Sequence, residues 1–119
     1  MKRIQKGQRL ATDAASRSQH EKRVGACVMK KNKVLSVGCN SYKTHPASGS
    51  YCKYHHAEFD ALIGLTRSDT LGATIFVARL RKDNKLAISK PCKSCQEMID
   101  AMGIKKVVYV NREGKWQNT

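Results

Sequence analysis

Two short segments constrain this chain more than any other feature of its sequence. The first reads H-x-E and begins at His56, and the second reads P-C-x-x-C and ends at Cys95. Imidazole and thiolate groups are zinc ligands, so His56, Cys92 and Cys95 predict a tetrahedral site whose fourth position is open to water. An open position is typical of a catalytic zinc, and Glu58 is left free for proton transfer. The fold must therefore bring two distant segments to one metal.

The length of the chain bounds its organisation. At 119 residues it is long enough for one hydrophobic core and too short for two, so we expect a single domain over residues 1–119. It contains no run of about 18 apolar residues, so we expect no membrane span. No apolar stretch follows the basic N-terminus to form a signal peptide. Five cysteines, an odd number, argue against a disulfide framework and favour a reducing, cytoplasmic compartment.

The charge balance is strongly basic. Lysine and arginine number 23 against 9 aspartate and glutamate residues, a formal net charge of +14 at pH 7. An excess of this size favours a polyanionic partner or a phosphate-bearing substrate, although a basic surface that serves solubility has the same composition. Aromatic residues make up 6% of the chain, so the sequence offers no evident stacking platform of the kind that single-strand binders use.

Apolar periodicity and turn residues predict alternating helices and strands. Helices are expected over residues 8–19, 56–67 and 91–103, the last with Pro91 in its first turn. Strands are expected over residues 24–29, 34–38, 73–80 and 104–110, and residues 115–118 are expected to pair back on the last of them. The connecting segments are expected to be a turn or small hairpin over residues 81–90 and a loop over residues 39–54. The strand at 24–29 hardly alternates, so both of its faces are expected to be covered. Cys27, within it, is expected in the core.

The order of these elements predicts the fold class. Helix, hairpin, helix, strand, helix, strand and a short tail indicate an α/β fold with helices packed on one mixed sheet of about five strands. Since the chain has 119 residues, nine follow Val110. A parallel strand needs a crossover of a dozen or more residues. A last strand must therefore be antiparallel and return through a turn at residues 111–114.

The zinc ligands are expected where helices begin. Cys92 and Cys95 are three residues apart, so they share a helix face, and the positive end of the helix dipole favours thiolates in the first turn. His56 and Glu58 are two residues apart, which on a regular helix places them on nearly opposite sides. Both reach one site only if His56 precedes regular helical geometry. Two helix N-termini are thus predicted to meet at the metal.

Other uses of the same residue types stay open. A structural zinc would add to the cysteine pair two of His55, His56, Cys52 and Cys39. Within a catalytic site His55 is the alternative to His56, and it would change the spacing to H-x-x-E. A second metal site would combine Cys52 with His45 or His55.

The chain resembles the cytidine deaminase superfamily, which includes the dCMP and tRNA adenosine deaminases. Its two zinc segments match the H-x-E and P-C-x-x-C motifs of zinc deaminases, and residues 24–40 resemble the family's opening hairpin, V-G-A-v-i-v followed by G-x-N. The resemblance covers roughly residues 10–110. It implies a three-layer α/β fold with helices on both faces of the sheet and an antiparallel C-terminal hairpin. The short tail is similar to that of free-nucleoside deaminases and several toxin-type polynucleotide deaminases.

The resemblance also implies the roles of the site residues. Three ligands hold Zn²⁺: His56, Cys92 and Cys95. Glu58 moves protons between water and the leaving amine. Asn40 contacts the sugar or base of the substrate, and the backbone of Ala57 helps to hold the base. For Asn40 the alternative is a turn residue at the end of a strand.

Three functions compete at this point. The charge slightly favours a zinc-dependent hydrolytic deaminase that converts cytosine to uracil in nucleic acid. The second candidate is a deaminase of free cytidine, deoxycytidine or dCMP, which by family resemblance would be a homo-oligomer. The third is a non-catalytic zinc domain that binds nucleic acid and does not need Glu58. Adenine deamination is a lesser alternative. The motifs indicate the reaction and leave the substrate open.

Overall fold

Within residues 3–19, 22–41 and 56–118, which the computed structural model describes, the chain forms one mixed sheet of six strands. The strands are β1 (Arg23–Lys30), β2 (Lys33–Cys39), β3 (Thr74–Leu80), β4 (Leu86–Ala87), β5 (Lys106–Val110) and β6 (Trp116–Asn118). They lie in the order β2-β1-β3-β5-β6, and β4 pairs with the end of β3. β4 forms a small hairpin with the end of β3, in the region where residues 81–90 predicted a turn or small hairpin.

The strand directions make the sheet a mixed one, as predicted. β1 is antiparallel to both β2 and β3, β3 is parallel to β5, and β5 is antiparallel to β6. The mixed sheet and the antiparallel C-terminal hairpin are therefore confirmed. A parallel pair needs a crossover connection, and between β3 and β5 that connection contains α4 (Lys93–Ala101).

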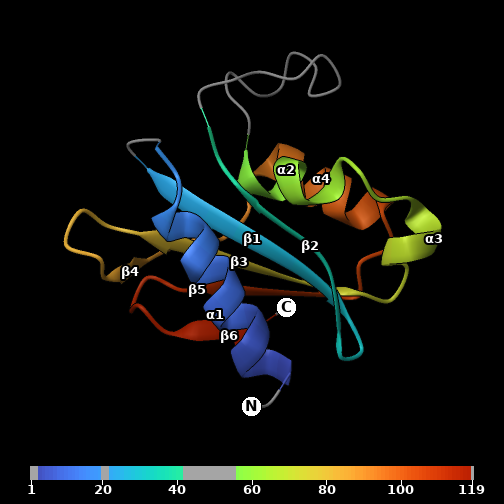
Figure 1. The fold of residues 1–119 in the computed structure, drawn as a ribbon, viewed down its shortest axis with the longest axis horizontal. Helices are drawn as coiled ribbons and strands as arrows, with labels where there is room; N and C mark the ends of the chain where they lie inside the picture. Colours follow the sequence, from blue (N-terminus) through green and yellow to red (C-terminus); the bar gives the residue numbers. More distant parts are fainter. Residues whose placement is uncertain (1–2, 20–21, 42–55, 119) are drawn as a thin grey trace.

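Helices cover both faces of the sheet (Figure 1). α1 (Arg3–Ser16) packs on one face, and α2 (Ala57–Leu62) and α4 pack on the other. Because successive strand residues point to opposite faces, Ala26 and Val28 join the core under α2 and α4, whereas Cys27 and Met29 join the core under α1. All four are at most 1% exposed. The predicted three-layer fold and the core position of Cys27 are confirmed. None of the described helices is both long and apolar enough to cross a bilayer.

The single helix predicted over residues 56–67 is wrong, because two helices occupy this region. α2 is six residues long, and α3 (Arg67–Thr70) begins separately after a turn. The break has a local cause. Gly64 disfavours continuation of α2, and Thr66 and Asp69 form a capping box in which each side chain accepts a hydrogen bond from the other's backbone N–H.

The limits of α1 also differ from the prediction. The helix begins at Arg3 rather than at residue 8, and it ends at Ser16 rather than at residue 19. Gly7 caused the late predicted start, since glycine is a poor helix former. In the fold the ring of Phe76 occupies the space that a Cβ at Gly7 would need. Glycine is therefore required there by packing against the sheet.

α1 lies directly against β1 at Gly25. A Cβ on this residue would overlap the carbonyl oxygen of Ala11 and the nitrogen of Ala15. Both alanines are fully buried. Because the contact is with backbone atoms, no side-chain rotation can relieve it. Small residues on both elements thus set the distance between helix and sheet.

We expect Gly25→Ala to lower the free energy of unfolding by about 2–3 kcal/mol and the midpoint of thermal unfolding by about 10 °C, because α1 must move away from β1. Circular dichroism during heating measures the midpoint. Gly64→Ala is the matched control, since no atom lies within 4 Å of a Cβ built there. Equal midpoints for the two variants would contradict the close packing of α1.

Candidate active site

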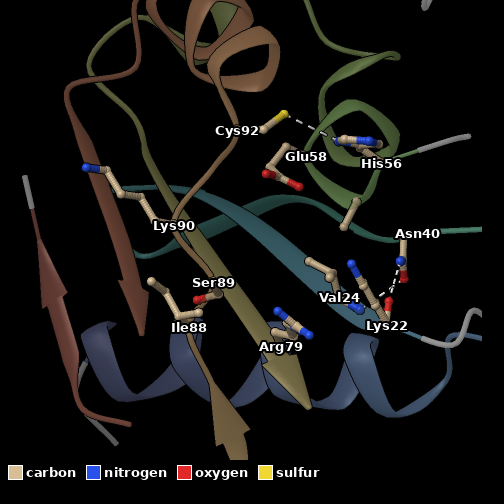
Figure 2. A pocket seen from close by; sticks show the side chains of 11 residues that line it. Lys22, Val24, Asn40, His56, Glu58, Arg79, Ile88, Ser89, Lys90 and Cys92 are labelled. Atoms are coloured by element: carbon tan, nitrogen blue, oxygen red, sulfur yellow. Dashed lines mark hydrogen bonds between the residues drawn. The ribbon is translucent and has the colours of Figure 1, made fainter. Parts of the chain in front are cut away.

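His56 lies at the start of α2. It is the N-cap residue, with extended backbone angles of φ −73° and ψ 151°. Its carbonyl oxygen accepts a hydrogen bond from the backbone nitrogen of Asp60 at 2.9 Å. The prediction that His56 precedes regular helical geometry is confirmed. For this reason the His56 and Glu58 side chains reach the same cavity despite their two-residue spacing (Figure 2).

Cys92 has the same position in α4. It is the N-cap residue, with φ −69° and ψ 168°. The prediction that Pro91 belongs to the first turn is wrong: Pro91 precedes the cap, because Cys92 still has the extended conformation of an N-cap. Cys95 lies in the first turn and is 2% exposed, whereas Cys92 is exposed. The two sulfurs therefore approach one point from the interior and from the surface.

The two helix starts bring three ligand atoms together. His56 Nδ1 lies 3.2 Å from Cys95 Sγ and 3.7 Å from Cys92 Sγ, and all three atoms are within 4.8 Å of one another. Around a tetrahedral zinc with bonds of about 2.1 Å to nitrogen and 2.3 Å to sulfur, the two atom types are about 3.6 Å apart. One imidazole and two thiolates at these separations fit Zn²⁺. No other such cluster of three ligands occurs in the part of the chain that the structure describes.

Glu58 is buried beside the cluster, with 5% of its surface exposed. Burial raises the pKa of its carboxyl, and hydrogen bonds with its own backbone and with Cys95 act in the opposite direction. Figure 2 shows the carboxylate between the metal ligands and the open cavity. A carboxyl whose pKa is raised by burial is suited to accept a proton and then to release it.

A cavity of about 210 Å³ adjoins these residues. In Figure 2 Glu58, His56 and Cys92 line one end, and Lys22 and Arg79 line the opposite end. The other lining residues are Val24, Asn40, Ala57, Ile88, Ser89 and Lys90. The cavity thus joins a metal-binding, acid–base end to a cationic end, which suits a ligand with a reactive group at one end and an anionic group at the other.

Asn40 lines this cavity just beyond the end of β2 and is 2% exposed. Its Oδ1 accepts hydrogen bonds from Ser18 Oγ at 2.6 Å and from the backbone nitrogen of Val24 at 2.9 Å. Its Nδ2 donates to the backbone oxygen of Lys22. These bonds fix the end of β2 against β1 and against the segment that follows α1. One N–H of the amide is left over from these bonds, so a substrate contact stays a prediction.

Ser89 is a site residue that the sequence did not reveal. Its hydroxyl donates to the carbonyl oxygen of Val77 at 2.7 Å and accepts from the backbone nitrogen of Val110 at 2.8 Å. These bonds tie the segment before α4 to both β3 and β5. Ser89 thereby fixes the cavity wall that leads to Cys92. Nothing in the local sequence distinguishes it from an ordinary loop serine.

Lys22 and Arg79 were also missed. Arg79 belongs to β3 and shares the sheet face of Ile75 and Val77, which are at most 1% exposed. An arginine that continues an alternating row of core residues is a signal that the sequence did contain. Lys22 had no such signal, because it lies outside the strand it precedes.

Among the remaining predicted site residues, some lie in the described part of the chain and others lie outside it. Ala57 is buried and lines the cavity, so its backbone is near the predicted base position. Cys39 is described and is not a member of the ligand cluster. The alternatives that involve His45, Cys52 and His55 lie outside the described residues.

Sequence comparison supplies the family. Residues 1–111 match the model of the cytidine and deoxycytidylate deaminase zinc-binding region. The chain belongs to this deaminase family. A deoxycytidylate deaminase of Mycobacterium phage D29 is 33% identical to it in an alignment 122 residues long with gaps counted, which covers 84% of this chain and 88% of the phage protein. The predicted superfamily is confirmed.

Solved structures share the fold of this deaminase. A cytidine deaminase from Burkholderia pseudomallei has a TM-score of 0.71 at 23% identity, over 97% of this chain and 90% of that one. A dCMP deaminase from the cyanophage S-TIM5 in apo form has a TM-score of 0.63 at 25% identity, over 96% of this chain and 89% of that one. The cytidine-deaminase-like fold is confirmed. With its family and its cluster of one histidine and two cysteines, the chain is a zinc-dependent hydrolase that acts on a C–N bond.

We expect the wild-type protein to contain about one zinc ion per chain and Cys95→Ala to lose most of it, because two remaining protein ligands bind zinc weakly. Elemental analysis by mass spectrometry after dialysis measures the zinc. Cys39→Ala, which removes a thiol outside the cluster, serves as the control and should keep its zinc. Full zinc content in Cys95→Ala would overturn the assignment of this ligand.

Proposed function

We propose that this deaminase converts free deoxycytidylate to deoxyuridylate and ammonia. The proposal rests first on the phage relative named deoxycytidylate deaminase, which is 33% identical over 84% of the chain. The cyanophage dCMP deaminase supports it at 25% identity, and that enzyme has also been solved in complex with dCMP and dUMP. A free nucleotide thus has better support than the nucleic-acid substrate that the net charge slightly favoured.

The charges in the cavity support a substrate that bears a phosphate. Arg79 is half-buried and has no ion-pair partner among the described residues. Lys22 lies beside it in Figure 2, and Lys90 lines the same cavity. A partly desolvated guanidinium gains most from an anionic hydrogen-bond acceptor, for which phosphate oxygens are well suited. A 5′-phosphate at this end leaves the base free to extend toward Glu58.

The described residues account for the chemical steps that deamination needs. His56, Cys92 and Cys95 hold Zn²⁺, which when bound supplies a Lewis acid and lowers the pKa of water to about 7. Glu58 accepts a proton from the attacking water and delivers a proton to the amine that leaves the pyrimidine ring. The backbone of Ala57 and the remaining N–H of Asn40 orient base and sugar. The homo-oligomer expected from the family resemblance stays a prediction, which light scattering would test.

The substrate preference is tested with a panel of dCMP, deoxycytidine, cytidine, single-stranded DNA and RNA. We expect kcat/KM for dCMP to exceed that for deoxycytidine by about tenfold or more, because one charge-assisted phosphate contact is lost in the nucleoside. Chromatography with mass detection measures the uracil products. Deamination confined to polynucleotides, with a log–log salt slope of about −0.7 per phosphate contacted, would refute the proposal.

The role of Glu58 is tested by Glu58→Gln, which keeps the size of the side chain and removes its acid–base function. We expect kcat for dCMP to fall by about 10²–10⁴-fold, while zinc content stays at the wild-type level. Activity assay and elemental analysis are made on the same preparation. Near-normal turnover in this variant would show that another group carries the proton.

The phosphate contact is tested by Arg79→Gln. We expect KM for dCMP to rise by about tenfold and kinetics on deoxycytidine to change little, since the nucleoside has no phosphate. Arg112→Gln, a change in the exposed turn between β5 and β6, is the control. Equal losses on nucleotide and nucleoside would indicate a structural role for Arg79 instead.

A further inference from the structure

A second hollow continues the active-site cavity at its cationic end. It has a volume of about 300 Å³ and shares Lys22 and Arg79 with that cavity. Its other lining residues are Leu80, Arg81 and Lys82. The two spaces therefore adjoin at Lys22 and Arg79, along a path from Glu58 to the end of β3. Four of the five residues that line the outer hollow are cationic.

Part of the positive charge along this path has no carboxylate partner among the described residues. Arg81 pairs with Asp83 at 3.7 Å, but the two side chains are 61% and 46% exposed, and such exposed pairs bind weakly. Neither Arg79 nor Lys82 has an ion-pair partner within the described residues. An anion in the hollow would therefore meet two cationic side chains, Arg79 and Lys82, that no carboxylate of the described residues pairs with.

The backbone that carries Arg79 and Arg81 is hydrogen-bonded to neighbouring segments. Arg79 pairs with Val24 of β1 on one side and with Ala87 of β4 on the other. The turn after β3 is closed by a hydrogen bond from Arg81 N to the Lys85 carbonyl oxygen at 2.9 Å, and the Arg23 guanidinium anchors it by donating to the Arg81 carbonyl oxygen. Binding an anion here would need little ordering of the backbone, which favours affinity.

We propose that the site accepts cytosine nucleotides with a phosphate chain longer than one unit, so that the enzyme deaminates dCTP as well as dCMP. The inference rests on the proposed function, since it places the first phosphate at Lys22 and Arg79. The following phosphates extend over Arg81 and Lys82. The chemistry is the same hydrolysis: water adds to the ring carbon, the C–N bond breaks, ammonia leaves, and the phosphate chain is untouched.

A polyphosphate fits this path better than a polynucleotide does. No aromatic residue lines either hollow among the described residues, whereas proteins that bind single strands stack successive bases on aromatic side chains. The hollow adds only Leu80, Arg81 and Lys82 beyond the shared residues. It therefore provides charge for a few phosphates and no surface for a second base.

The test compares kcat/KM for dCMP, dCTP and a single-stranded oligonucleotide in the full-length zinc-loaded protein. We expect dCTP to be deaminated with a kcat/KM at least equal to that for dCMP. Lys82→Ala should lower kcat/KM for dCTP by about tenfold and that for dCMP by less than about twofold, and Lys82→Arg should restore most of the loss. Lys105→Ala is the control, because Lys105 is exposed next to the end of β5 that pairs with the start of β3, away from Arg79.

The outcomes separate this inference from the proposed function. Turnover of dCMP with no turnover of dCTP overturns the inference and leaves the proposed function standing. Equal losses on both nucleotides in Lys82→Ala also overturn it, since they would reflect a general change in charge or folding. Oligonucleotide turnover above that of dCTP would favour a polynucleotide path. If no nucleotide is deaminated by zinc-loaded protein, the proposed function fails as well.

Discussion

The convergence of one imidazole and two thiols at the starts of α2 and α4 is the constraint on which the architecture depends. The three ligand atoms lie within 4.8 Å, so both helices must lie on the same face of the sheet with their N-termini together. The parallel pairing of β3 and β5 places α4 on that face through its crossover connection. α2 can lie close to β2 because Gly38 has no side chain: a Cβ at this position would lie 2.6 Å from the backbone nitrogen of Ala61. Metal binding and close packing therefore require the same arrangement.

The active site lies where the apolar layer under α2 and α4 gives way to polar groups. Ile75 and Val77 are core residues, and Arg79 follows on the same strand face as part of the cavity wall. Along one strand the environment thus changes from apolar packing to a cationic cavity wall. Glu58 stands at the metal end of the cavity, where burial raises the pKa of its carboxyl. Because the Glu58 carboxyl and the cationic side chains lie at opposite ends of the cavity, they do not neutralise each other, and one small substrate can contact both.

The net charge of +14 was the weakest guide to function. It slightly favoured nucleic acid, because composition counts charges without their positions. The structure places Lys22, Arg79 and Lys90 at the active-site cavity and Arg81 and Lys82 beside it, which is a distribution that a small phosphorylated substrate can use. The relatives named for deoxycytidylate point the same way. Basic composition alone therefore pointed to a phosphate and carried no information on the size of the molecule that bears it.

The sequence by itself determined the metal ligands, the free carboxylate, the order of elements and the double-sided burial of β1, because motif spacing and hydrophobic patterning are local properties of the chain. It also required His56 to precede its helix, since a two-residue spacing cannot place both side chains on one face of a regular helix. Only the tertiary structure decided that Arg79, Lys22 and Ser89 belong to the site, because strand pairing and the β3–β5 crossover bring them to the cavity from distant segments. It also decided that Asn40 first fixes the fold, since its partners Ser18 and Val24 belong to other segments of the chain. Chemistry that depends on residues close together in the sequence could be predicted from it. A cavity lining that is assembled from distant segments could not.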